Sequence, residues 1–116
     1  MNDKPQETRY AAFVLVWTKA GWAQRLAKRA STVSVGPNRG YDEIVAIARW
    51  AAPVTGQGRD SPDVIVGVSA TDEEAIEVLV EEIRHLPGVR NPQDPQVVHL
   101  DPRYKEGWER PHNGWP

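Results

Sequence analysis

Cysteine is absent from the 116 residues of this chain. Disulfide bonds and cysteine-ligated metal sites are therefore excluded. Long apolar segments are absent as well, because the longest run, residues 11–17, is far shorter than the roughly 20 residues of a membrane-spanning helix. Residues 1–9 are polar and lack the apolar segment of a secretory signal peptide. We therefore expect a cytoplasmic protein without a membrane partner.

The motifs of common catalytic and cofactor sites are also absent. The run Gly56-Gln57-Gly58 lacks the spacing of a phosphate-binding or dinucleotide-binding loop. The histidines lie too far apart in sequence to form a recognised metal-ligand motif, and no nucleophile elbow is present. We therefore predict no metal site and no cofactor, and we favour a non-catalytic protein.

Charge is unevenly distributed along the chain, although the net charge is only −2. Residues 11–41 contain five basic residues and no acidic one, whereas residues 42–82 contain ten acidic and two basic residues. The basic block indicates either a phosphate-binding patch or a basic helix beside an acidic helix on one sheet. We favour the second, because nucleic-acid-binding domains normally carry a positive total charge. A nucleic-acid partner is not expected.

Residues 62–89 show the clearest structural pattern, a buried strand that leads into an amphipathic helix. Thr71 has N-cap chemistry, and Glu74 completes a capping box. Pro87 and Gly88 end the predicted helix. The apolar residues recur on one helical face: Ala75, Ile76, Leu79, Val80 and Ile83.

The remaining elements follow from shorter patterns. Residues 10–18 predict a strand that is apolar on both faces, and residues 22–30 predict a short helix. Residues 41–54 fit a helix or a strand. The turn-rich loop 55–62 favours the strand, because the strand after it needs an antiparallel partner. Residues 96–101 predict a final strand.

Alternation within two of these strands predicts which side chains share a face. In residues 41–54, a strand would place Ile44, Ala46, Ala48 and Trp50 on one face and Val45, Ile47 and Arg49 on the other. In the final strand, Val98 and Leu100 are predicted to point inward.

The order of elements predicts an α+β fold of the ferredoxin-like β-α-β-β-α-β type, with two helices on one face of an antiparallel sheet. Three parts follow: a flexible arm at residues 1–9, the ferredoxin-like domain at residues 10–101, and a C-terminal tail at residues 102–116. The tail is rich in Trp and Pro.

Apolar residues on both faces of the sheet predict a homo-oligomer, most simply a two-fold dimer that covers the face without helices. The alternative is that the tail folds back over this face. The large side chains expected at the interface are Phe13, Trp17, Trp50, Trp108 and Trp115.

Four short runs resemble the effector-binding domain of Lrp/AsnC regulators: Val54-Thr55-Gly56, residues 63–68 (DVIVGV), Asp72, and residues 86–89 (LPGV). The resemblance covers about half of the chain. It implies a ferredoxin-like dimer, often built into octamers, that senses amino acids at contacts between subunits. Thr55, Gly56 and Asp63 match the ligand loop of that family.

The sequence departs from the family in three ways. The loop between Gly56 and Asp63 is longer, the DNA-binding helix-turn-helix has no counterpart before the first strand, and the Trp-containing tail is extra. We therefore expect a stand-alone sensor or regulatory module that binds an amino-acid-like small molecule, rather than a transcription factor.

Two other functions stay open. A dimeric α/β-barrel enzyme of the monooxygenase or isomerase type would use His99 as a general base or haem ligand if it faced the open side of the sheet. Tyr41, Trp17 and Trp50 would then line the pocket. An adaptor protein would instead bind a partner through the tail.

Overall fold

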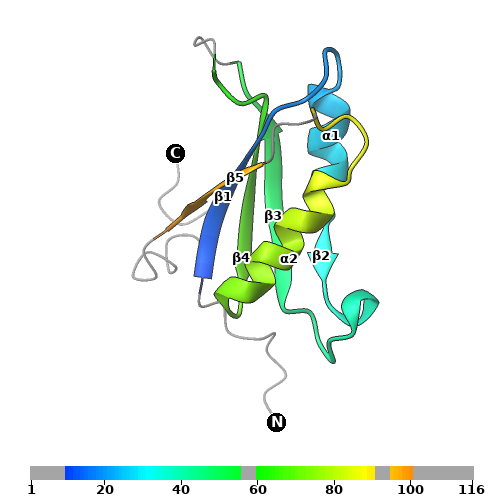
Figure 1. Cartoon of the computed structure of the whole chain (residues 1–116), viewed down its shortest axis with the longest axis vertical. Coiled ribbons are helices and arrows are strands. Elements are labelled where there is room, and N and C mark those ends of the chain that lie inside the picture. Colours follow the sequence, from blue (N-terminus) through cyan, green and yellow to red (C-terminus); the bar gives the residue numbers. More distant parts are fainter. Residues whose placement is uncertain (1–9, 56–59, 91–94, 101–116) are drawn as a thin grey trace.

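The protein is described by a computed structural model that covers residues 10–55, 60–90 and 95–100. Within these residues the fold is α+β, with a five-stranded antiparallel sheet and two α-helices, which confirms the predicted class (Figure 1). The elements are, in chain order, β1 (Tyr10–Val16), α1 (Ala23–Ala30), β2 (Ser34–Val35), the short 3-10 helix η1 (Pro37–Arg39), β3 (Ala46–Pro53), β4 (Val64–Ala70), α2 (Glu73–Arg84) and β5 (Gln96–His99).

The strands lie in the order β2-β3-β4-β1-β5, and every neighbouring pair is antiparallel. The ambiguous segment 41–54 contains β3, so the prediction of a strand there is confirmed. Its partner β4 follows after the turn-rich loop, as the sequence indicated. The two-residue strand β2 adds an edge beside β3.

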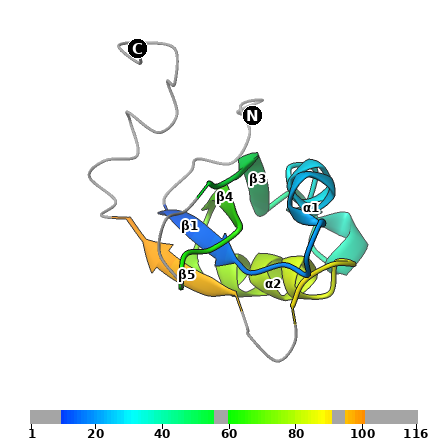
Figure 2. The same ribbon diagram turned by 90° about the horizontal axis from the view of Figure 1, so that it is seen from above.

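One face of the sheet carries the core. Alternate residues of β1 and β4 are completely buried on this face, where they pack with side chains of both helices. Both helices lie on the same side of the sheet (Figure 2). The largest fully buried side chains include Leu26 of α1 and Ile76, Leu79 and Ile83 of α2, each of which stabilises the fold by roughly 1.5–3 kcal/mol through burial.

Helix α2 begins one residue later than predicted. Asp72, not Thr71, is the N-cap, and its Oδ1 accepts a hydrogen bond from the Ala75 N–H at 2.8 Å. Thr71 instead belongs to the end of the sheet, where its own N–H donates to the Val45 carbonyl at 2.9 Å. Both residues have N-cap chemistry, so the sequence pattern alone does not separate them.

A β-bulge changes the face on which Trp50 lies. Ala48 pairs with Val68 and Trp50 pairs with Gly67, so Arg49 is an extra residue in β3. A bulge reverses the alternation beyond it. Trp50 therefore points away from the helices, whereas Ala46 and Ala48 belong to the core. The predicted shared face of these three residues is wrong.

The inward residue of β5 is Val97, which pairs with Val14 and packs against the core. Val98 pairs with Phe13 on the opposite face and is 46% exposed. The prediction that Val98 points inward is therefore wrong by one residue of register. A shift of one residue exchanges the two faces of a strand.

Neither helix in the described ranges combines the length and the apolar character that a membrane crossing requires. The predicted arm at residues 1–9, Gly56, and the tail at residues 102–116 with Trp108 and Trp115 lie outside the described residues.

Candidate functional site

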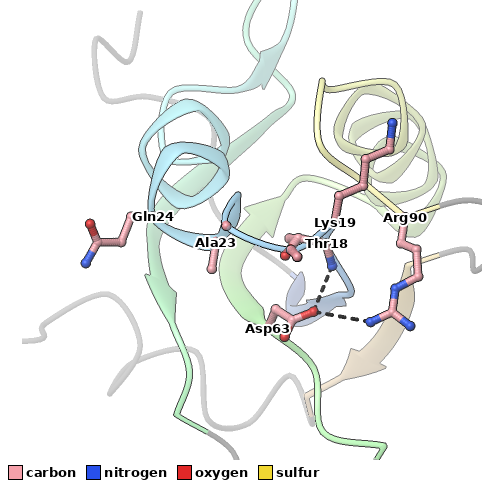
Figure 3. A pocket seen from close by; sticks show the side chains of 8 residues that line it. Thr18, Lys19, Ala23, Gln24, Asp63 and Arg90 are labelled. Carbon is pink, nitrogen blue, oxygen red and sulfur yellow. Dashed lines mark hydrogen bonds and ion pairs between the residues drawn. The ribbon is translucent and has the colours of Figure 1, made fainter.

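An open cleft of about 720 Å³ lies where β1 ends and α1 begins. Its walls come from three parts of the chain that are distant in sequence: the β1–α1 junction, the start of β4 and the segment after α2 (Figure 3). We call it the α1 cleft. It is lined by Thr18, Lys19, Ala20, Gly21, Ala23, Gln24, Asp63 and Arg90.

Asp63 is fixed in the α1 cleft by backbone and side-chain contacts. Its N–H donates to the Val16 carbonyl at 2.9 Å, and its Oδ2 accepts a hydrogen bond from the Thr18 N–H at 2.8 Å. The same oxygen lies 3.7 Å from a guanidinium nitrogen of Arg90. The carboxylate is therefore oriented by β1 and partly neutralised by a cation from the segment after α2.

The rest of the cleft is held by contacts between the end of β1 and the segment after α2. The Lys19 N–H donates to the Gly88 carbonyl and the Arg90 N–H donates to the Trp17 carbonyl, both at 2.8 Å. Two backbone hydrogen bonds in opposite directions make a short antiparallel bridge. This bridge brings Lys19 and Arg90 to one rim, although they are far apart in sequence.

The second candidate surface is the face of the sheet opposite the helices. One row of paired residues crosses four strands of this face, from Trp50 through Gly67 and Phe13 to Val98. The rings of Phe13 and Trp50 meet above Gly67, with centroids 5.9 Å apart and planes tilted by 57°, a favourable aromatic geometry. Leu15 and Ile65 form part of the next row.

We call this surface the helix-free face. It is defined by Phe13, Leu15, Trp50, Ile65 and Val98. Trp50 is 38% exposed and Val98 is 46% exposed. It also carries Arg49, whose Nε–H donates to the Ser69 hydroxyl at 2.8 Å.

The predicted ligand residues are only partly brought together. Asp63 lines the α1 cleft. Thr55 is exposed beyond the end of β3 and is not among the residues that line the cleft.

The residues predicted for an enzyme pocket lie apart. Trp17 is buried, and its indole N–H donates to the Asp60 carbonyl at 3.3 Å. Tyr41 packs against the core near the β2–β3 edge of the sheet, whereas His99 is exposed on β5 at the opposite edge. His99 pairs with core residue Ala12, so it lies on the side of the sheet that carries the helices and not on the helix-free face.

The two blocks of opposite charge are in contact through an ion pair. Arg39 of η1 forms an ion pair with Glu82 of α2. The contact comes from the end of the basic block and not from α1. In the described ranges no cluster of three or more potential metal ligands occurs.

Sequence reasoning missed Thr18, Lys19, Gln24 and Arg90. The only available signal was a basic residue between the predicted strand and the predicted helix, followed by Gly21, where the strand pattern ends. Nothing in the sequence indicates that Arg90 joins them.

Comparisons with family models, with curated proteins and with solved structures found no match to this chain. The geometry of the α1 cleft and of the helix-free face is therefore the basis for a functional conclusion.

Proposed function

We propose that this protein is a ferredoxin-like, oligomeric binding module that senses a small amino-acid-like molecule without catalysing a reaction. The observation that carries the proposal is the apolar row from Trp50 to Val98 on the helix-free face, combined with an oriented carboxylate in a neighbouring cleft.

The order of elements supports the ferredoxin-like assignment. Leaving out the short edge strand β2, the chain runs β1-α1-β3-β4-α2-β5, and these strands lie in the order β3-β4-β1-β5. In a split β-α-β arrangement, the two strands that a helix connects are not adjacent, because one other strand lies between them. Here β4 lies between β1 and β3, and β1 lies between β4 and β5. Strand β2 is an addition to that plan.

The helix-free face supports assembly. Each of four neighbouring strands contributes at least one large apolar side chain to this face, and Trp50 and Val98 retain considerable exposure. Contiguous apolar surfaces of this kind mark interaction sites. A second copy presents the same surface, so a two-fold dimer covers both faces at once.

Asp63 supports binding of a small molecule. Its side chain is 37% exposed, so part of the carboxylate faces the cleft while Oδ2 is held by the Thr18 N–H. An oriented carboxylate can accept a hydrogen bond from a ligand ammonium group. The cleft thus has the chemistry expected for an amino-acid-like ligand.

No specific contact favours the enzyme alternative. His99 and Tyr41 belong to opposite edges of the sheet, and His99 does not lie on the face that a barrel-type dimer would enclose. The adaptor alternative depends on the tail, which lies outside the described residues.

The proposal is tested by thermal unfolding and light scattering with each standard amino acid. At a concentration of about one hundred times Kd, a ligand that binds only the folded state stabilises it by about 2.7 kcal/mol, a rise in Tm on the order of 10 °C. The expected result is such a rise for a subset of amino acids in a protein of multimeric mass. An unchanged Tm with every amino acid would contradict the sensing function.

A further inference from the structure

The Thr18 hydroxyl is a buried polar group in the wall of the α1 cleft. Thr18 is only 5% exposed. Its N–H donates to Asp63, but its hydroxyl has no hydrogen-bond partner among the described residues. Buried polar groups in folded proteins are normally paired. Because Thr18 is among the residues that line the cleft (Figure 3), a bound molecule is a natural partner for its hydroxyl.

The first turn of α1 points to the same kind of partner. The N-cap residue Trp22 provides no side-chain hydrogen bond, and the first turn has no acidic residue. The leading N–H groups of a helix have no partners within the helix and carry partial positive charge. Ala23 and Gln24, which belong to this turn, both line the α1 cleft. These donors suit an anionic group.

The charges around the cleft indicate how much negative charge a ligand should carry. Lys19 and Arg90 are cationic, and Asp63 is anionic. Arg90 is the cation close to Asp63, at 3.7 Å. Lys19 is thus the positive charge in excess. One surplus charge suits a singly charged carboxylate better than a phosphate dianion, which Asp63 would repel about twice as strongly.

We propose that the α1 cleft binds the carboxylate group of a small organic acid or amino acid. The Thr18 hydroxyl and the first-turn N–H groups of α1 donate hydrogen bonds to it, and the Lys19 ammonium group supplies the opposite charge. This inference rests on the proposed small-molecule-binding function and assigns the carboxylate end of the ligand to named groups.

The test is a titration of the full chain followed by NMR of the backbone amides. The probes are acetate, each standard amino acid and inorganic phosphate, together with acetamide and the amino-acid amides, which lack the carboxylate charge. The expected result is that carboxylates shift the amide signals of Thr18, Ala23 and Gln24, whereas the amides do not. Binding of acetate but of no amino acid indicates that the ligand is a simple organic acid. Tighter binding of one amino acid than of acetate indicates that the ammonium group of the amino acid also contributes.

Two variants test the proposed donors. Thr18→Val removes the hydroxyl at nearly constant volume, and Lys19→Gln removes the charge. Each should raise Kd for the best carboxylate roughly tenfold, because a hydrogen bond to a charged group is lost. Lys28→Gln removes an equal charge from the other end of α1 and should leave Kd unchanged.

A third variant separates binding from folding. Gln24→Glu places an acid in the first turn, where it should raise Tm through the helix dipole while lowering carboxylate affinity roughly tenfold by repulsion. A purely structural role for this turn would not produce opposite changes.

Several results would overturn the inference and still leave the proposed function standing. These are amino-acid binding that shifts amides away from the cleft, affinity unchanged in Thr18→Val and Lys19→Gln, or phosphate binding more tightly than every carboxylate. If no probe binds at millimolar concentration, both the inference and the sensing function fall, while the light-scattering mass still reports on assembly alone.

Discussion

Gly88 fixes the start of α1 against the end of α2 through a contact that only glycine permits. Its φ is +97°, and an added Cβ would lie 2.5 Å from Cε3 of Trp22. Trp22 is also covered by the guanidinium group of Arg25, 4.2 Å from the ring centroid. Because the Gly88 carbonyl holds the Lys19 N–H, this contact also positions the rim of the α1 cleft.

We predict that Gly88→Ala destabilises the protein by about 3 kcal/mol, the sum of an unfavourable left-handed backbone and overpacking against Trp22. Gly40→Ala is the matched control, because Gly40 has φ +90° but open space around its Cα. It should cost only about 1–2 kcal/mol. Urea unfolding measures both, and equal losses would show that the Trp22 contact has no energetic importance.

The pH dependence of Glu81 is a second prediction at the residue scale. A side-chain hydrogen bond from Arg84 lowers the pKa of the Glu81 carboxyl from its ordinary value of 4.5, assisted by nearby positive charges. A lowered folded-state pKa contributes stability that is fully present above the unfolded value and is lost as pH falls through the folded value.

Glu81→Gln should therefore be slightly less stable than the wild type at neutral pH and equally stable in acid well below 4.5. The effect is small because the carboxyl is exposed to solvent. Urea unfolding at both pH values measures it, with Glu77→Gln as a control for losing a charge on the same helix. A difference that persists in acid would contradict the assignment.

At the scale of the element, the start of α2 gives a direct test of the corrected N-cap. Asp72→Ala removes the acceptor for the Ala75 N–H and should destabilise the protein by about 1 kcal/mol. Thr71→Ala should cost less, because the Thr71 hydroxyl has only a long contact of 3.5 Å to the Val45 carbonyl. Thermal unfolding distinguishes the two variants. A larger loss of stability for Thr71→Ala would support the original prediction that Thr71 is the N-cap.

Element types were predictable where apolar periodicity and turn residues agreed. The strand before α2, the buried face of α2 and the short helix α1 all follow from local patterns. The bulge at Arg49 does not, because nothing in the local residue types marks the extra residue. Pairing with β4 decides it, and that one residue moves Trp50 from the helix side to the helix-free face.

The sequence pointed to the candidate site only at Asp63, through the resemblance to the ligand loop of Lrp/AsnC regulators. Thr18, Lys19 and Arg90 have no common motif. They meet because the end of β1 bridges the segment after α2, and this is a tertiary contact. The positions of Thr55 and His99 likewise depend on strand ends and register, which local patterns define poorly.

At the scale of the whole molecule, the proposed assembly depends on the helix-free face. Trp50→Lys should convert the proposed dimer to a monomer, because a charge buried within an apolar interface is strongly unfavourable. Ile44→Lys is the matched control: Ile44 is 50% exposed and precedes β3, outside the helix-free face. Light scattering of both variants measures the effect, and a multimeric mass for Trp50→Lys would place the interface elsewhere.

The most direct test is the mass of the unmodified chain by sedimentation equilibrium over a wide range of concentrations. We predict a mass of at least twice the 13.0 kDa of one chain, falling toward the monomer only on strong dilution. A single-chain mass at every concentration would contradict the proposed assembly.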